Sequence, residues 1–291
     1  MQPPGSSEVQ CSHLDVSDAK LYYEVRGQGP LFLIMAGGNG TAAFFASFAS
    51  LLSSHFQVVT YDRRGFWRSP IRDATNLDAS RLLRANVADA AALIQHLSPS
   101  APSIVFGSSW AANIAMNLLN THPQLVWKVI VHEPVLGNLF TPKMLQGFSE
   151  DIDRIIAAFR QRGVPAANAI LTAITSSKRD RELFVGSPVF KQLMLIPPSN
   201  QDWYFGVEMV EWRQFTTFEP EVLLDHRSKL VLMRGAEESP DLTAQPICVL
   251  SDRLNLPVVD MPGGHLGYIT HQQEFIDSLA QLLSHHERAR L

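Results

Sequence analysis

The sequence predicts an α/β protein whose mostly parallel sheet is flanked by helices, and three observations lead to this fold class. Apolar runs of strand length, "LFLIMA", "FQVVTYD" and "PSIVFG", alternate with helix-like segments. "LFLIMA" is apolar at every position, which is typical of a strand buried on both faces of a parallel sheet. The alternation returns near the carboxyl end with "SKLVLMRG" and "PVVDMPGG".

The other core elements follow from composition and periodicity. "LYYEVRGQGP" alternates like a strand and ends in a Gly/Pro turn, and "WKVIVHEP" is a further strand. The first twelve residues, "MQPPGSSEVQCS", are expected to be a short floppy start. Helices are expected over "TAAFFASFASLLSS", "SRLLRANVADAAALIQHL", "AANIAMNLLNTH", "QPICVLSDRL" and "EFIDSLAQLLSHH".

The alternation of strands and helices stops in the middle of the chain. "EDIDRIIAAFRQRG" and "VPAANAILTAIT" are helical in composition, and the aromatic-rich "DWYFGVEMVEWRQF" follows them. We therefore expect an α/β core of residues 1–136 and 226–291, with a helical cap inserted at residues 137–225.

Composition excludes several classes of function. The chain has 291 residues, a formal net charge of −4 and 18% charged residues, and no Lys/Arg cluster suggests nucleic-acid binding. Cys11 and Cys248 lie far apart without a metal-type spacing, so we expect neither a disulfide framework nor a zinc site. Without a signal peptide or an apolar run of about 18 residues, the sequence predicts a cytoplasmic protein that does not span a membrane.

The segment 107–111, "GSSWA", approximates a G-x-S-x-G turn between a strand and a helix. Such a turn exposes its central serine, so Ser109 is the candidate nucleophile and the N–H of Trp110 a candidate oxyanion donor. Ser108 is the weaker candidate, because the large residues Phe106 and Trp110 would then occupy the two glycine positions of the motif. The alternative is that Ser109 is an ordinary loop serine.

A serine nucleophile needs a histidine oriented by a carboxylate. His265 in "DMPGGHLGYIT" lies on a glycine-rich loop after the last strand. Two positions remain open for the acid: Glu238, with Glu237 close by, after "KLVLMRG", and Glu133 at the end of "VIVHEPV". Glu238 could equally lie in a solvated acidic loop, and Glu133 could belong to a buried structural pair with His132.

The glycine loop allows two functional interpretations. Residues 38–43 fit a loose G-x-G-x-x-A dinucleotide pattern, and Asp62 ends the next strand where a ribose-binding acid would lie. Alternatively, Gly37 and Gly38 allow a tight turn that directs backbone N–H groups at a developing oxyanion. A third possibility is that these glycines only permit the turn.

Taken together, these motifs resemble those of the α/β-hydrolase family, in particular a capped, esterase- or lactonase-like branch of serine hydrolases. "AGGNG" is similar to the family's H-G-G-x-G loop with Ala36 in place of histidine, and "YDRRGFWRS" to its D-x-R-G-x-G-x-S segment with Trp67 at a usual glycine. "FGSSWAA" and "PGGHLGY" resemble the nucleophile turn and the histidine loop.

The resemblance implies the α/β-hydrolase fold and a hydrolase without cofactor or metal. Ser109 would form an acyl-enzyme, His265 would act as general base, and the N–H groups of Gly38 and Trp110 would bind the oxyanion. Asp62 would be a structural acid that holds its neighbouring loop, including Arg63 or Arg64, and not a ribose ligand.

The expected substrate is a small apolar ester, thioester or lactone, because the cap is rich in aromatic residues and has no Lys/Arg cluster. Asn39, Trp67, Trp203 and Trp212 are the expected substrate-binding residues. Two alternatives stay open: epoxide opening, cyclisation or C–C cleavage in secondary metabolism, or a non-catalytic ligand-binding protein. The sequence does not predict an oligomeric state.

Overall fold

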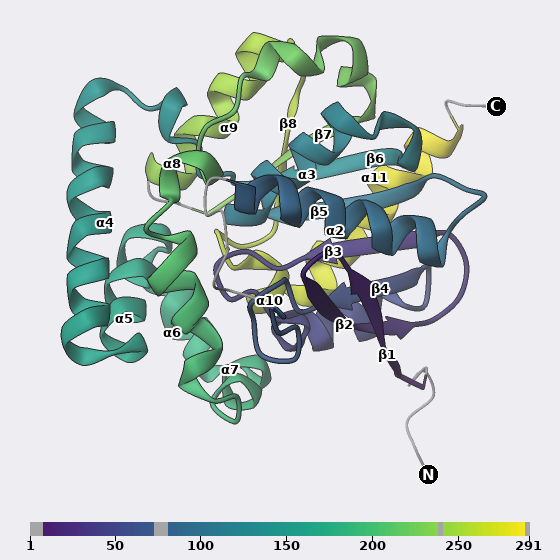
Figure 1. Ribbon diagram of the computed structural model, residues 1–291. Coiled ribbons are helices and arrows are strands. Elements are labelled where there is room, and N and C mark those ends of the chain that lie inside the picture. The colour runs from purple at the N-terminus through teal and green to yellow at the C-terminus, as the bar shows by residue number, and fades with distance from the viewer. Residues whose placement is uncertain (1–7, 73–80, 238–240, 289–291) are drawn as a thin grey trace.

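The computed structural model describes residues 8–72, 81–237 and 241–288 (Figure 1). Within them, eight strands form one sheet in the order β1-β2-β4-β3-β5-β6-β7-β8. β1 and β2 are antiparallel to their neighbours and the others are parallel, which confirms the expected fold class. The strands are β1 Gln10–Val16, β2 Ala19–Arg26, β3 Leu31–Met35, β4 Gln57–Tyr61, β5 Ser103–Ser108, β6 Val126–His132, β7 Leu230–Gly235 and β8 Val258–Met261.

Strand β1 corrects the expectation of a floppy start, because it begins at Gln10 inside the segment assigned to that start. It pairs with β2 over its whole length, with Leu14 opposite Leu21. The side chains of β1 are mostly exposed, so main-chain hydrogen bonds hold this edge strand. Its sequence therefore lacks the apolar pattern that reveals a buried strand.

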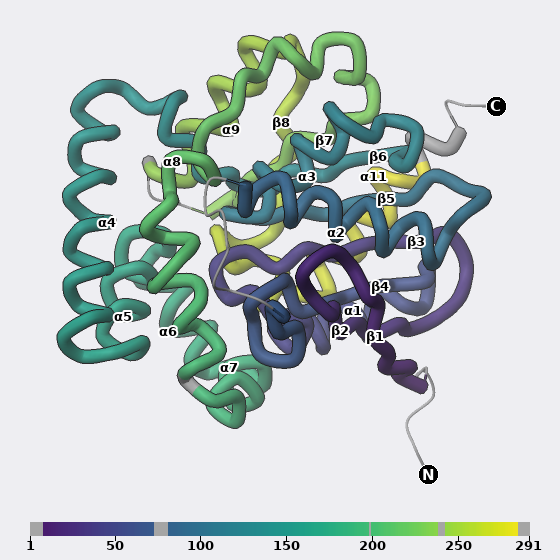
Figure 2. The backbone as a smooth tube through the Cα atoms, viewed as in Figure 1, coloured from purple at the N-terminus to yellow at the C-terminus, as the bar shows by residue number. Residues whose placement is uncertain are grey.

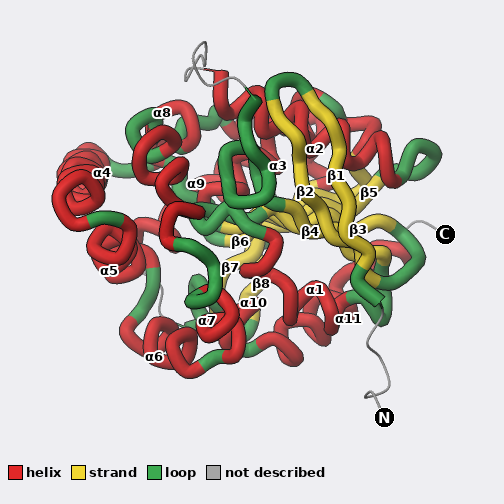
Figure 3. The backbone as a smooth tube through the Cα atoms, turned by 60° about the horizontal axis from the view of Figure 1, so that its bottom comes forward, coloured by secondary structure: helices red, strands yellow, loops and turns green. Residues whose placement is uncertain are grey.

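Helices cover both faces of the sheet (Figure 3). Leu33 and Met35 of β3 pack into one apolar cluster, with residues of α2, α3 and α9, whereas Phe32 and Ile34 pack into another, with residues of α1 and α11. Successive side chains of a strand point to opposite faces, so β3 contributes to both layers. These helices are α1 Ala46–Leu52, α2 Leu82–Leu97, α3 Trp110–Thr121, α9 Asp241–Leu254 and α11 Gln272–Arg288.

The chain between β6 and β7 forms helices that gather beside the sheet, on the left in Figures 1 and 2. Thr141 caps the amino end of α4, since its hydroxyl accepts a hydrogen bond from the N–H of Met144, and Gly163, with φ of 76°, caps the carboxyl end. We call residues 137–225 the helical segment, with the boundaries that the sequence predicts. Its helices are α4 Pro142–Arg162, α5 Val164–Thr175, α6 Lys178–Gly186, α7 Pro188–Leu193, the π-helical turn η6 Tyr204–Glu208 and α8 Trp212–Phe215.

Short helical turns complete the described chain. They are η1 Ala42–Phe45, η3 Pro123–Leu125, η4 Gly137–Leu139, η5 Pro198–Gln201, η7 Pro220–Lys229 and α10 Gly267–Thr270.

The parallel strands all end at one edge of the sheet. Met35 lies opposite Gly107, Ser108 opposite His132, and Gly235 opposite Met261. The loops that follow these strands therefore meet, which is where open α/β sheets bind ligands.

Candidate active site

Ser109 lies on a strained turn between β5 and α3. Its φ is 56° and its ψ −124°, a conformation that costs a non-glycine residue about 1–3 kcal/mol. The N–H of Ser109 donates to the carbonyl of His132 at 3.0 Å, which fixes the turn against β6. Gly107 is required here, since a Cβ on it would lie 2.7 Å from the Ala111 carbonyl oxygen. The turn thus has the geometry that presents a nucleophile.

His265 reaches Glu133 across the carboxyl edge of the sheet. Its Nδ1 lies 2.8 Å from Glu133 Oε2, while Glu133 Oε1 accepts from the N–H of Gly235 at 2.9 Å. Both residues are buried: Glu133 is 0% exposed and His265 is 4% exposed. The structure therefore brings together His265 and the second of the two acid candidates. Glu238 lies outside the described residues.

The electrostatics of Glu133 favour a carboxylate. Burial raises its pKa, but the hydrogen bond and charge of His265, with the Gly235 N–H, outweigh burial and lower the pKa to about 2. A carboxylate can only accept, so Nδ1 of His265 carries a proton and Nε2 of the neutral ring is a free base. Glu237, by contrast, lies near Arg179 and His271 and forms no hydrogen bond with His265 among the described residues.

The glycine loop after β3 lies directly against the Ser109 turn. A Cβ built on Gly37 would lie 3.5 Å from Ser109 Cβ and 3.7 Å from the backbone nitrogen of Trp110. Gly38 packs under the ring of Tyr204, whose Cζ would lie 2.7 Å from a Cβ there. Both N–H groups expected to bind an oxyanion therefore belong to adjoining loops at the same strand edge.

Arg63 holds this loop from behind. It is fully buried, and it donates from Nε to the carbonyl of Ala36 at 2.8 Å and from Nη2 to the carbonyl of Gly37 at 2.9 Å. The Gly37 carbonyl and the Gly38 N–H belong to one peptide unit and point in opposite directions. Because Arg63 fixes the carbonyl, it also fixes the direction of the Gly38 N–H.

Glu208 of η6 completes this arrangement from the helical segment. Its carboxylate accepts two hydrogen bonds from Arg63, at 2.6 and 2.9 Å, and both side chains are fully buried. This bidentate pair raises the pKa of Arg63 despite burial. Tyr204, on the same turn, contacts both Gly38 and the ring of Trp110. The turn thus joins the helical segment to both expected oxyanion donors.

Asp62 has the structural role expected of it, but the expected arginine partners were wrong. It is completely buried and accepts hydrogen bonds from Thr41 and from the N–H of Ala42. It also binds Arg68, whereas Arg63 pairs with Glu208 and Arg64 with Asp89. With its oxygens occupied, Asp62 offers no acceptor to a ribose.

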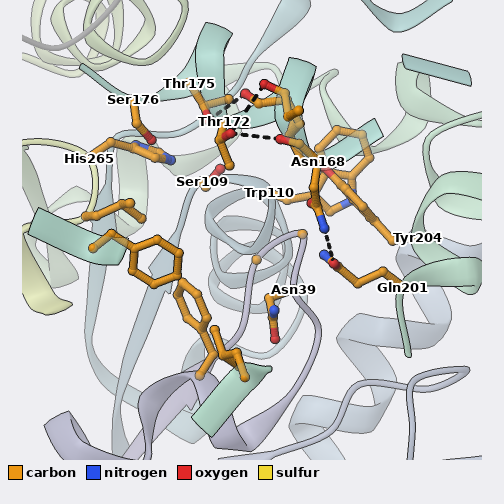
Figure 4. A pocket seen from close by; sticks show the side chains of 18 of the residues that line it. Asn39, Ser109, Trp110, Asn168, Thr172, Thr175, Ser176, Gln201, Tyr204 and His265 are labelled. Carbon is orange, nitrogen blue, oxygen red and sulfur yellow. Dashed lines mark hydrogen bonds between the residues drawn. The ribbon is translucent and has the colours of Figure 1, made fainter. Parts of the chain in front are cut away.

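A cavity of about 520 Å³ lies over the Ser109 turn. Ser109, Trp110, His265 and Gly38 line it, and in Figure 4 the ring of His265 points toward Ser109. Most of the remaining wall is apolar. Its apolar residues include Phe44, Val135, Phe148, Ile152, Phe184, Phe190 and Leu193.

The substrate-binding expectations need correction for three of four residues, since of these four only Asn39 lines the cavity. Trp67 is 42% exposed and stacks on the Arg68 guanidinium. Trp203 packs on Gly65, and Trp212 is buried against Phe148. These three rings stabilise loops and the helical segment. A large aromatic residue in the sequence does not reveal which way its ring points.

The comparisons with known proteins agree with this geometry. A model described as the alpha/beta hydrolase family matches residues 32–278. The chain belongs to this family. An uncharacterized hydrolase, YraK of Bacillus subtilis (strain 168), is 28% identical over 273 residues, which cover 93% of this chain and 94% of YraK.

Solved structures of α/β hydrolases have the same fold. A thermophilic esterase from Thermogutta terrifontis superposes with a TM-score of 0.71 at 14% identity, covering 94% of this chain and 98% of the esterase. The enol-lactonase from Burkholderia xenovorans LB400 gives a TM-score of 0.69 at 15% identity, covering 94% and 100%. No helix among the described residues combines the length and apolar composition needed to cross a membrane.

In this α/β hydrolase, the sequence did not point to several residues beside the cavity. Asp180 of α6 is buried, accepts from the N–H of Leu266 at 3.3 Å, and thereby holds the histidine loop. Arg63 and Glu208 were also missed as a pair. The two consecutive arginines in "DRRG" draw attention to Arg63. No local sequence pattern indicates its partner Glu208, which lies 145 residues further along the chain.

Proposed function

We propose that this hydrolase cleaves a neutral, largely apolar carboxylic ester, thioester or lactone through an acyl-enzyme on Ser109. The observation that carries the proposal is the His265–Glu133 hydrogen bond of 2.8 Å at the strand edge where the strained Ser109 turn lines a cavity. It supplies the oriented base that a serine nucleophile needs.

In the proposed reaction, Nε2 of His265 takes the proton from Ser109 Oγ as Oγ bonds to the acyl carbon. The bond to the leaving oxygen or sulfur then breaks, and His265 returns the proton to that atom. Water, deprotonated by His265, releases the acid and restores Ser109. The buried Glu133 carboxylate holds the ring in the required tautomer and stabilises the imidazolium of each step.

The N–H groups of Gly38 and Trp110 bind the oxyanion in this proposal. Arg63 acts as a positioning residue through the Gly37 carbonyl, and Glu208 positions Arg63 from the helical segment, which serves as the cap. Preorganised donors of this kind stabilise a charge that develops only in the transition state.

The cavity wall supports the substrate class. Arg181 is the one Lys or Arg, and no Asp or Glu occurs, among the described residues that line it. Related folds in an esterase and an enol-lactonase agree with acyl chemistry. A cytoplasmic location remains part of the proposal, and the free thiols of Cys11 and Cys248 fit it.

Labelling with a fluorophosphonate probe, followed by peptide mapping, tests the proposal. We expect one adduct, on Ser109, that is absent from Ser109→Ala. A folded wild-type protein that forms no adduct would contradict the serine mechanism and leave a ligand-binding role or acid/base chemistry.

A further inference from the structure

One wall of the cavity presents hydrogen-bond acceptors from α5. Thr172 Oγ1 lies 2.8 Å from the carbonyl oxygen of Asn168, and Thr175 Oγ1 lies 2.9 Å from that of Leu171. A carbonyl only accepts, so each hydroxyl spends its proton there and retains lone pairs for a ligand. Thr172 and Thr175 line the same cavity as Ser109 and His265, and Figure 4 labels all four.

Asn200 adds a third acceptor whose orientation is fixed. Its Nδ2 donates to the carbonyl of Asn39 at 3.2 Å, so its other amide atom must be the oxygen. That Oδ1 is buried without a hydrogen-bond partner among the described residues, in a side chain that lines the cavity and belongs to a residue only 6% exposed. Asn39, another residue that lines the cavity, also has a buried Oδ1 without a hydrogen-bond partner among the described residues. An unsatisfied buried acceptor costs about 1–3 kcal/mol, which a ligand donor would recover.

Arg181 is the one Lys or Arg among the described residues that line the cavity. Arg181 directs Nη1 to the main-chain carbonyls at the end of α5, including that of Ser176. Among the described residues, no carboxylate lines the cavity to pair with an ammonium group, and the acceptor oxygens would repel a carboxylate.

We propose that the substrate carries a neutral hydrogen-bond donor, an amide N–H or a hydroxyl, that binds the acceptor wall of Thr172, Thr175 and Asn200. This inference rests on the proposed function, because it takes the cavity over Ser109 as the substrate site. It narrows the substrate from any apolar ester to one with a secondary amide or alcohol away from the reacting carbonyl.

Matched esters test the donor directly. The methyl esters of N-acetyl-β-alanine, N-acetyl-γ-aminobutyric acid and N-acetyl-ε-aminocaproic acid each have an N–H, which their N-methyl analogues lack. At the chain length that reaches the wall, we expect kcat/KM to be about tenfold higher for the N–H ester, as one neutral hydrogen bond provides. The triple variant Thr172→Val, Thr175→Val, Asn200→Ala should bring this ratio to about one.

Thr121→Val is the matched control, because Thr121 is exposed and makes the same hydroxyl bond to its own helix, at 2.7 Å. It should keep the wild-type ratio. Melting temperatures check that the triple variant is folded. A ratio near one at all three lengths in wild-type protein, with Ser109 labelled by the phosphonate, would overturn the donor inference alone.

If the phosphonate does not label Ser109 of the wild-type protein, the proposed function is contradicted. Calorimetric binding of N-methylhexanamide against N,N-dimethylhexanamide then decides the donor preference without turnover. Equal affinities would overturn it, and tighter binding of the N-methyl amide would support it.

Discussion

Two adjacent serines lie in different surroundings, and the comparison bears on the proposal that Ser109 is the nucleophile. Ser108 Oγ lies 3.0 Å from His132 Nδ1, and both residues are buried beneath the strand edge. Ser109 is the next residue, but the turn places it in the cavity with His265. His265 has a carboxylate on its other nitrogen, whereas Nε2 of His132 has no hydrogen-bond partner among the described residues. In the proposed mechanism, Ser109 is therefore the serine that a substrate can reach, and His265 is the histidine that a carboxylate orients.

Replacing each of the two serines separately by alanine should give the largest expected difference in kcat. Ser109→Ala should lower kcat for a responsive ester by about 10⁴-fold or more, because no nucleophile remains. Ser108→Ala should retain kcat within severalfold and lower only stability, since its hydroxyl is buried. Steady-state kinetics and melting curves on both variants measure these effects. Equal losses of kcat would contradict the assignment of Ser109, and not Ser108, as the nucleophile.

The carboxylate is the second point of difference. Glu133→Gln should lower kcat about 10³- to 10⁴-fold, because an amide that donates to Nδ1 would favour the wrong tautomer of His265. Glu238→Gln, kinetically measured beside it, should change kcat little. A large loss in Glu238→Gln with an active Glu133→Gln would reverse the assignment of the acid.

The third prediction concerns the Gly38 N–H, the proposed oxyanion donor whose peptide unit Arg63 holds. Glu208→Gln and Arg63→Lys should each lower kcat about 10- to 100-fold with little change in KM, because a misdirected Gly38 N–H weakens only transition-state binding. Arg234→Lys, which exchanges an exposed Arg–Asp pair, is the matched control. A change confined to KM or to melting temperature would make the Arg63–Glu208 pair merely structural.

The smallest effect is on stability and comes from His132. Burial, the largest influence, lowers its pKa to about 4 from the ordinary 6.5. The unfolded chain then binds more protons below pH 6.5, so the free energy of unfolding should fall by about 3 kcal/mol between pH 6.5 and 4. Glu133, with its lowered pKa, loses its contribution only below about pH 4.5.

Urea unfolding at several pH values measures this dependence. His132→Gln should flatten the slope between pH 6.5 and 4, and the exposed His55→Gln should leave it unchanged. An unchanged slope in His132→Gln would mean that other groups dominate acid unfolding.

The sequence alone determined the sheet core, the Ser109 turn and the histidine loop. Each is a local pattern: an apolar run marks a buried strand, and small residues around Ser109 permit a strained turn. The exposed strand β1 carries no such pattern and was missed.

Only the tertiary structure decided which distant groups meet. Glu133 and His265 are 132 residues apart and Arg63 and Glu208 are 145 apart, and strand register and helix packing bring each pair together. Tertiary structure also decided that the rings of Trp67, Trp203 and Trp212 pack on loops and on the helical segment instead of lining the cavity. It likewise decided which face of α5 lines the cavity, and so which of its hydroxyl groups can accept a hydrogen bond from a ligand. Sequence fixes local conformation because it acts through neighbouring residues, whereas a site depends on side-chain direction across elements that meet only in the fold.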